Sequence, residues 1–320
     1  MNVKSEVLRA EHRIRQHIRE TPLEYSCHLS ELAGCHVFLK LENLQFTGSF
    51  KMRGAINKLL TLSAEERVKG VVTASTGNHG LAVARGLKRL GIQGTIYLPE
   101  NTSPQKIELL SRYEADLRFY GSESAEAESY AREESQREGT IYVSPYNDPQ
   151  IIAGQGTIAV ELLRHLDRID AVFVSVGGGG LISGIAGFLK GANKATRVVG
   201  CLPENSPTMA ESICAGRIVE SRIQSTLSDG TAGGIEPEAI TFDLCEQYVD
   251  EWVLVDENEI RDAMKLIFER HRLVIEGAAG VSVASFLRMK GRFRTHKTAN
   301  VVLVICGGNV DIEKFKQLVF

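Results

Sequence analysis

Short apolar runs and longer amphipathic segments alternate along most of the chain, with a regular rhythm from residue 70 onward. Each apolar run has the length of a strand and is followed by a turn and a segment of helical period. We predict strands at 71–74, 95–98, 116–120, 141–143, 171–176, 197–201, 253–255 and 301–305. We predict helices that begin near Asn78, Pro104, Ser122, Pro149, Leu181, Asn258, Ala278 and Asp311. This alternation indicates an α/β fold with open, mostly parallel twisted sheets that are flanked by helices.

The N-terminal part of the chain is patterned less regularly. Residues 5–19 have an amphipathic period that predicts a helix, and Thr21-Pro22 ends it because a proline disfavours helical geometry at the residue before it. A strand is expected at 36–41 and a helix at 51–62. Residues 221–237 are rich in glycine, serine and threonine, which predicts a long, ordered loop.

A chain of 320 residues is long enough for two lobes. We place a small, mobile lobe at residues 70–147, where the strand–helix rhythm begins. It is inserted into a larger lobe made of residues 1–69 and 148–320.

Composition is that of a soluble globular protein, with 43% apolar and 24% charged residues. The formal net charge of −3 gives no reason to expect nucleic acid or an anionic membrane as a partner. The six cysteines include no CxxC pair, so zinc-site spacing is absent and a disulfide framework is not expected. The charged N-terminus has no apolar core of signal-peptide type, and we therefore expect a cytoplasmic protein.

The segment 49–54, Ser-Phe-Lys-Met-Arg-Gly, contains the first candidate for chemistry. Lys51 is predicted to open a helix, and the positive end of the helix dipole disfavours a second positive charge. A partly desolvated pocket acts in the same direction, so the pKa of this lysine is expected below the usual value of roughly 10.4. Such an amine can bond covalently to a carbonyl cofactor. A lone lysine at a helix start is usually solvated, so the interpretation depends on the loops that follow.

The run 177–180 consists of four consecutive glycines between a predicted strand and a predicted helix. Bare backbone N–H groups at a helix N-terminus attract a phosphate group. Neither GxGxxG nor GxxxxGK[ST] occurs here, which argues against a dinucleotide or a nucleoside triphosphate. A terminal phosphate monoester fits this loop, and a glycine-rich turn without a ligand is the alternative for the loop taken alone.

Two further loops lie at the expected carboxyl edges of the sheets, where ligands bind in α/β proteins. Residues 75–80, Ser-Thr-Gly-Asn-His-Gly, suit a carboxylate and a phenolic oxygen at a helix start. Residues 306–309, Cys-Gly-Gly-Asn, end the last strand. Taken alone, the loop 75–80 is interpreted as the capped start of a helix. Taken alone, Cys306 is interpreted as a buried structural cysteine. Together with the lysine and the glycines, they suggest a phosphorylated aldehyde, pyridoxal 5′-phosphate (PLP).

These four motifs occur in the order found in the fold type II PLP-dependent enzymes, and the chain most resembles the threonine/serine dehydratase and serine racemase group. Two further segments, 153–157 (AGQGT) and 275–280 (IEGAAG), extend the resemblance over nearly the whole chain. The resemblance implies the two-lobed, tryptophan synthase β-like architecture.

The resemblance also implies residue roles. Lys51 binds the cofactor aldehyde and moves the α-proton of the substrate, and Thr76 stands where racemases carry a second acid/base residue. Cofactor contacts are implied for Phe50, Lys51, Asn78, Gly177, Gly178, Gly179, Gly180, Leu181 and Cys306. Asn78 faces the phenolic oxygen and Cys306 the ring nitrogen. Substrate contacts are implied for Ser75, Asn78, His79 and Gly230.

The activity that this resemblance implies is a PLP-dependent ammonia-lyase (dehydratase). It would convert L-threonine, L-serine or a related β-hydroxy amino acid to a 2-oxo acid and ammonia. A serine racemase is the alternative, although Thr76 replaces the serine of that group. A β-replacement synthase would usually have threonine at the position of His79. A non-catalytic amino-acid-binding paralogue and a nicotinamide-dependent dehydrogenase are the remaining alternatives.

Three further expectations follow from the resemblance. Some relatives bind Mg²⁺ or Ca²⁺ through a glutamate and an aspartate where this chain has Leu202 and Thr208, so we expect no metal, with Glu204 as the residue that could substitute. The chain ends soon after Asp311, so a C-terminal regulatory domain and feedback by isoleucine are not expected. The partner is expected to be another copy of the chain, in a homodimer or tetramer.

Overall fold

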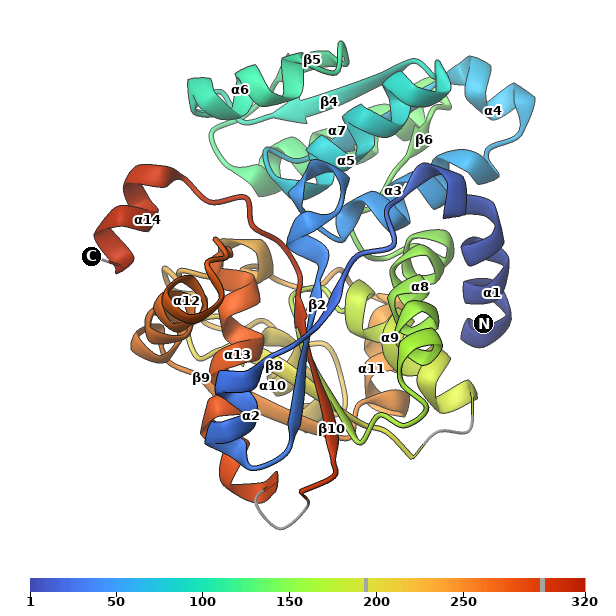
Figure 1. Cartoon of the computed structure of the whole chain (residues 1–320). Helices are drawn as coiled ribbons and strands as arrows, with labels where there is room; N and C mark the ends of the chain where they lie inside the picture. Colours follow the sequence, from blue (N-terminus) through green and yellow to red (C-terminus); the bar gives the residue numbers. More distant parts are fainter. Residues whose placement is uncertain (193–194, 294–296, 320) are drawn as a thin grey trace.

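The computed structural model describes residues 1–192, 195–293 and 297–319, and its strands form two separate sheets (Figure 1). The larger sheet has the order β1-β2-β10-β7-β8-β9. Its strands are β1 (Leu23–Tyr25), β2 (His36–Leu41), β7 (Ala171–Ser175), β8 (Arg197–Pro203), β9 (Glu251–Val255) and β10 (Asn300–Ile305). The smaller sheet has the order β5-β4-β3-β6. Its strands are β3 (Val71–Ala74), β4 (Gly94–Leu98), β5 (Asp116–Phe119) and β6 (Ile141–Tyr142).

Helices surround both sheets. In the first half of the chain they are α1 (Val3–Ile14), α2 (Cys27–Ala33), α3 (Lys51–Thr61), α4 (Ala64–Lys69), α5 (Asn78–Leu90), α6 (Pro104–Ser111), α7 (Ser124–Glu138) and α8 (Pro149–His165). In the second half they are α9 (Gly180–Gly191), α10 (Thr208–Ala215), α11 (Ile240–Tyr248), α12 (Glu257–His271), α13 (Gly277–Met289) and α14 (Ile312–Val319). None of the helices in the described part of the chain is both long and apolar enough to cross a membrane.

The predicted fold class is confirmed. Among the strand pairs of both sheets, only β1 and β2 run antiparallel, and the others are parallel. All residues of β7 are buried, as are all but the first of β10, because helices cover both faces of the larger sheet. The smaller sheet, with α5, α6 and α7, occupies the top of Figure 1, above the larger sheet. Its strands all come from residues 71–142. The lobe boundaries at 70 and 147 stay a prediction.

Helix α3 lies between the two sheets and carries Lys51 at its first position. It packs on α8 and α5, and its apolar residues join a core cluster with residues of α5, β3 and α8. The approach to α8 is close because glycines face each other: a Cβ on Gly154 would lie 2.6 Å from the Gly54 Cα. Any larger residue at this crossing would push α3, and therefore Lys51, away from α8.

A fully buried ion network fixes the same helix. The Glu161 cluster consists of Lys40, Glu42, Arg53 and Glu161, all with 0% of the side chain exposed. The Arg53 guanidinium donates to both oxygens of Glu42 at 2.8 Å and to both oxygens of Glu161 at 2.7 and 2.8 Å. Lys40 Nζ donates to Glu161 at 2.5 Å. Because Arg53 follows Lys51 by two residues, the cluster anchors the start of α3 to β2 and α8.

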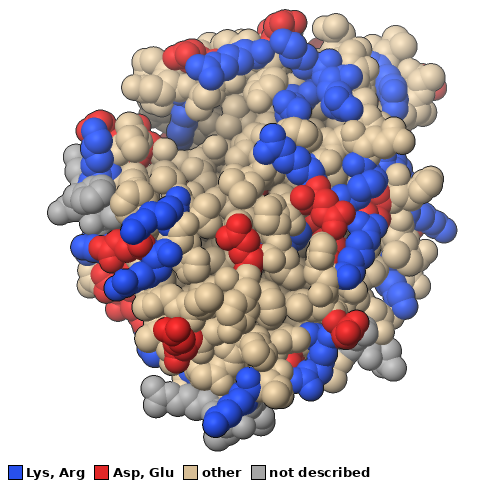
Figure 2. Space-filling view, in the orientation of Figure 1, with Lys and Arg blue, Asp and Glu red and all other residues tan. Residues whose placement is uncertain are grey.

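Charges of both signs are spread over the molecular face in Figure 2, with broad uncharged areas between them. Many of the exposed pairs are short-range, such as Arg112 with Glu108 at 2.8 Å on successive turns of α6. Exposed pairs of this kind contribute little to stability, so the buried cluster is the larger electrostatic feature of the fold.

Candidate active site

The structure brings the Lys51 segment against the loop that follows β10, as the sequence predicted for motifs at a carboxyl sheet edge. The Phe50 N–H donates to the Cys306 carbonyl at 3.0 Å, and the Gly308 N–H donates to the Gly48 carbonyl at 2.9 Å. Ser49 and Gly307 form an isolated antiparallel bridge between these hydrogen bonds. The lysine is therefore held by backbone contacts to the end of the central strand.

The Lys51 side chain is partly buried, and its environment lowers its pKa. Its Nζ donates to the Pro145 carbonyl at 2.7 Å and lies 5.3 Å from the centroid of the Phe50 ring. Loss of hydration lowers the pKa from 10.5 to about 8, and the negative charge of Glu276 opposes this shift. At pH 7 about one such amine in ten is unprotonated, compared with on the order of one in three thousand for a solvated lysine. This supports the prediction of a reactive amine.

The four glycines form a bare loop at the start of α9. Gly179 occupies the N-cap position with φ +86°, and no side chain caps this helix start. A Cβ on Gly178 would lie 2.5 Å from the ring of Tyr146, and one on Gly177 would lie 2.9 Å from the Thr231 Cα. No side chain fits at these positions, so the loop itself presents only backbone groups at the helix start, beside the Tyr146 ring. Such an arrangement suits a phosphate group.

Tyr146 connects this loop to the lysine. The preceding residue, Pro145, accepts the hydrogen bond of Lys51 Nζ. The Tyr146 phenol oxygen accepts a hydrogen bond from the Glu236 N–H at 2.8 Å, which ties it to the loop of residues 221–237. No local sequence pattern predicts this contact, because Lys51, Tyr146 and Glu236 are far apart in the chain.

The loop 75–80 leads from β3 into α5, whose first residue is Asn78. Ser75 and Thr76 are partly buried there. The His79 imidazole is buried, and its Nε2 lies 3.1 Å from Thr73 Oγ1 and 3.0 Å from the Val143 carbonyl. Burial lowers its pKa to about 3, and the charge of Lys51 adds to this. The imidazole is therefore neutral and held within the smaller sheet, so the substrate role predicted for His79 would fall to its backbone N–H.

Asn78 is oriented by two partners. Its Nδ2 donates to both carboxylate oxygens of Glu276, at 3.0 and 2.9 Å, and its Oδ1 accepts from Asn309 Nδ2 at 2.7 Å. Its predicted contact with the phenolic oxygen of the cofactor remains a prediction, since its amide hydrogens face Glu276. Cys306 Sγ lies 3.9 Å from the same carboxylate. Two of the four sequence motifs, the 75–80 loop and the 306–309 loop, thus meet at Glu276.

No role is predicted for Glu276 from the sequence, although it lies in the segment 275–280 that contributes to the family resemblance. The side chain is only 4% exposed. Burial raises its pKa from 4.5 to about 7, opposed by the hydrogen bonds from Asn78 and reinforced by the charge of Asp229. Gly230 lies beside it, because a Cβ there would be 3.7 Å from Glu276 Oε1. An acidic residue directly before a glycine-rich helix start was the available signal.

The positions considered for a metal have other contacts. Leu202 is buried in β8, and Thr208 Oγ1 donates to the Gly233 carbonyl at 3.1 Å. Glu204 lies 3.5 Å from Arg288. Among the described residues, no group of three or more His, Cys, Asp and Glu side chains is arranged to hold a metal ion.

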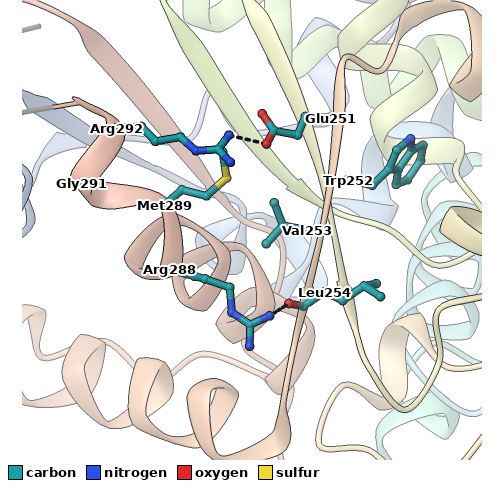
Figure 3. A pocket seen from close by; sticks show the side chains of 8 residues that line it. All are labelled: Glu251, Trp252, Val253, Leu254, Arg288, Met289, Gly291 and Arg292. Carbon is teal, nitrogen blue, oxygen red and sulfur yellow. Dashed lines mark hydrogen bonds and ion pairs between the residues drawn. The ribbon is translucent and has the colours of Figure 1, made fainter. Parts of the chain in front are cut away.

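A pocket of about 440 Å³ lies away from these motifs, between β9 and the end of α13 (Figure 3). It is lined by Glu251, Trp252, Val253, Leu254, Arg288, Met289, Gly291 and Arg292. Arg292 is paired with Glu251, and Arg288 donates to the Leu254 carbonyl and pairs with Glu259. Both cations are thus already bound within the protein, and we assign no ligand to this pocket.

Comparison with known proteins agrees with the geometry. The sequence matches the family described as "Pyridoxal-phosphate dependent enzyme" over residues 14–307. It is 40% identical over 317 residues to the L-threonine ammonia-lyase of Thermotoga maritima, covering 98% of this chain and 77% of that protein. It is 38% identical to the catabolic L-threonine dehydratase of Escherichia coli, covering 98% and 94%. The solved structure of maize serine racemase has a TM-score of 0.92 at 31% identity, covering 98% and 95%. With a match over most of its length and relatives of this similarity, the chain belongs to the pyridoxal-phosphate dependent enzyme family.

Proposed function

We propose that this protein is an L-threonine ammonia-lyase (dehydratase) that also accepts L-serine or a related β-hydroxy amino acid. The products are a 2-oxo acid and ammonia. The observation that carries the proposal is the partly buried, low-pKa amine of Lys51, joined through Pro145 and Tyr146 to an uncapped tetraglycine helix start. The threonine ammonia-lyase of Thermotoga maritima and the threonine dehydratase of Escherichia coli, at 40% and 38% identity, support the choice of substrate.

The residues present fit PLP. The backbone of Gly177–Gly180 and Leu181 would hold the phosphate, since a Cβ on any of these glycines would contact a neighbour at 3.0 Å or less. Lys51 would bind the aldehyde, Phe50 would lie against the ring and Cys306 would face the ring nitrogen. When bound, this cofactor supplies an electron sink that stabilises negative charge on the substrate α-carbon.

Lys51 is the proposed general base for the α-proton. An amine with a pKa near 8 accepts a proton readily at neutral pH and also releases it. Its hydrogen bond to the Pro145 carbonyl shows that the Nζ reaches the space next to Tyr146. The substrate carboxylate would bind at Ser75, Asn78 and the first turn of α5, where the helix dipole favours negative charge.

Cys306 would act as a neutral partner of the ring nitrogen. Burial and the neighbouring Glu276 carboxylate raise the pKa of its thiol well above 9.0, so the sulfur carries no charge near neutral pH. A neutral thiol does not hold a ring nitrogen in its charged form as a carboxylate would. This favours prompt loss of the β-hydroxyl over reactions that need a long-lived carbanion.

The test is a panel of β-hydroxy amino acids scored for 2-oxo acid release. We expect L-threonine and L-serine to be turned over, and the Lys51→Ala variant to lose both covalent cofactor and product release. Lys69→Ala is the matched control, because Lys69 is exposed at the end of α4 and should leave both unchanged. Turnover retained in Lys51→Ala would overturn the proposal.

Serine racemase activity is a second candidate, supported by the hydroxyl of Thr76 in the 75–80 loop and by the likeness to maize serine racemase. A β-branched threonine is stiffer at χ1 than serine, which argues for a weaker second acid/base. Chiral analysis of serine after incubation distinguishes the two: a D-serine yield that rivals pyruvate would reverse the ranking.

We also propose a cytoplasmic homo-oligomer. The support for the compartment is that all six cysteines are free thiols in the structure. The support for assembly is the family resemblance, with a homodimer or tetramer as the expected state. Sedimentation of the purified protein would give the number of copies.

A further inference from the structure

Glu276 has no part in the chemistry above, yet two of the four motifs, the 75–80 loop and the 306–309 loop, contact it. It occupies the N-cap position of α13, but its side chain does not cap that helix. The carboxylate instead accepts hydrogen bonds from Asn78 Nδ2 at both of its oxygens. Glutamate is not among the residues that usually cap a helix N-terminus, so its contact with another segment points to a different role.

The contacts of Glu276 leave little freedom for its neighbours. A Cβ on Gly307 would lie 2.5 Å from Glu276 Oε1, so the backbone after Cys306 packs directly on the carboxylate. Cys306 Sγ lies 3.9 Å from the same oxygen. Asn309 Nδ2 holds the opposite end of the Asn78 amide at 2.7 Å. The orientation of Asn78 is therefore set by Glu276 on one side and Asn309 on the other.

The charges around Glu276 do not neutralise it. The loop after β10 contributes the neutral thiol of Cys306, α5 contributes the Asn78 amide, and Asp229 from the 221–237 loop adds a second negative charge. Lys51 is the described cation whose charge acts on this carboxylate, and it forms no ion pair with it. The Glu276 side chain is thus 4% exposed and has no ion-pair partner among the described residues.

We propose that Glu276 is a positioning residue for the cofactor site: it fixes Asn78 and Cys306, and a proton on its carboxylate changes the hydrogen bonds that it offers them. This inference rests on the proposed function, because it assigns both residues to the cofactor. The raised pKa of about 7 agrees with it, since burial without a counter-ion favours the neutral acid.

The two protonation states differ in what they offer. As a carboxylate, Glu276 only accepts, so Asn78 must present its Nδ2 hydrogens and Cys306 its S–H. As a neutral acid, Glu276 carries an O–H donor, so Asn78 and Cys306 no longer have to donate hydrogens to both of its oxygens. One proton thereby changes the hydrogen bonding of both residues that are assigned to the cofactor ring.

The holoenzyme tests this through its visible absorbance as a function of pH. The wild-type protein should show a spectral transition with a midpoint near pH 7, and Glu276→Gln, which cannot titrate, should lack it. Glu108→Gln is the matched control, because Glu108 is exposed on α6 and makes the same chemical change elsewhere. A transition that persists unchanged in Glu276→Gln would overturn the proposal.

Glu276→Asp keeps the test decisive if Glu276→Gln does not fold. It retains the charge but is one methylene too short for the two contacts with Asn78, so cofactor dissociation should become about tenfold easier while a pH transition remains. An unchanged dissociation constant in Glu276→Asp would contradict the positioning role.

Infrared spectroscopy of the full-length protein gives a reading that needs no cofactor. A protonated-carboxyl stretch should appear below pH 7 in the wild-type protein and be missing in Glu276→Gln. If Lys51 bound no cofactor, the proposed function would fail while this band still reported the proton on Glu276. If the cofactor bound and the band were absent, only the inference about Glu276 would fail.

Discussion

Two of the buried carboxyl groups of this protein, Glu161 and Glu276, have opposite electrostatic environments. Glu161 on α8 is 0% exposed, and Glu276 at the start of α13 is 4% exposed. Glu161 faces two buried cations, Arg53 and Lys40, at 2.5 to 2.8 Å. Glu276 faces an amide, a thiol and the charge of Asp229. Burial is common to both, and the partners differ.

The pKa values follow the partners. Burial alone would raise the pKa of Glu161, but the charges and hydrogen bonds of Arg53 and Lys40 outweigh it and lower the pKa to about 2. No such compensation exists for Glu276, whose pKa rises to about 7. A fully paired carboxylate keeps its charge and fixes the fold, whereas an unpaired one keeps a proton available near neutral pH. This difference separates a structural cluster from a functional site.

The largest expected effect is on stability at the Glu161 cluster. Glu161→Gln leaves Lys40 and Arg53 buried with one negative partner fewer, which should cost about 3–5 kcal/mol of unfolding free energy. Urea unfolding at neutral pH measures it. Glu108→Gln, which removes one partner of the exposed pair with Arg112, should cost less than about 0.5 kcal/mol. Equal losses in the two variants would remove the distinction between a structural network and a surface pair.

The next expected effect is a gain in stability on substitution of Glu276, and its size depends on pH. Because the folded pKa of Glu276 lies above its unfolded value of 4.5, its contribution to stability is complete below pH 4.5 and is lost as the pH rises through 7. The loss amounts to about 3 kcal/mol, and Glu276→Gln should escape it. Relative to wild type, this variant should therefore gain stability between pH 4.5 and 7. Urea unfolding across this range measures the gain, and parallel curves would contradict the raised pKa.

Glu161 should give the mirror image at lower pH. Its folded pKa of about 2 lies below the unfolded value of 4.5, so its contribution is present above pH 4.5 and is lost as the pH falls toward 2. Wild type should lose about 3 kcal/mol in this window that Glu161→Gln does not lose. Thermal unfolding at stepped acidic pH compares the two, and the same acid sensitivity in both would show that other carboxylates dominate.

A smaller loss of stability is expected from substitution of Glu236, whose exposure lies between that of buried Glu161 and that of exposed Glu108. Its side chain is 21% exposed, and it accepts from Arg132 of α7 at 2.5 Å and from Asn147 at 2.9 Å. These contacts join a helix of the smaller sheet to the 221–237 loop next to Tyr146. Glu236→Gln should cost about 1 kcal/mol and make the loop easier to cleave by protease. Unchanged cleavage would show that the loop is held by other contacts.

The sequence predicted the sheets well where apolar runs were strong. The bounds of β3 and β10 agree with the predicted 71–74 and 301–305 within one residue. It missed β1, which has three mostly exposed residues, and α2, α4, α10 and α11, which are short. Such elements are stabilised by tertiary contacts and carry little periodicity of their own.

The candidate site was predictable as a set of loops and not as a set of contacts. Motifs at the ends of β3, β7 and β10 were expected to meet at sheet edges, and hydrogen bonds now join Asn78 to Asn309 and Phe50 to Cys306. The Glu161 cluster and the role of Glu276 escaped prediction because polar residues from distant segments pair only once the chain is folded. No local pattern distinguishes the carboxylate that will pair with buried cations from the one that forms no ion pair within the described part of the chain.

Lys51 is the amine that we propose to bind PLP, in a partly desolvated environment. Borohydride reduction of the holoenzyme followed by peptide mass spectrometry tests it most directly. We predict one phosphopyridoxyl group per chain, located on Lys51. A modification found on another lysine, or an unmodified Lys51 in protein that contains the cofactor, would contradict the account.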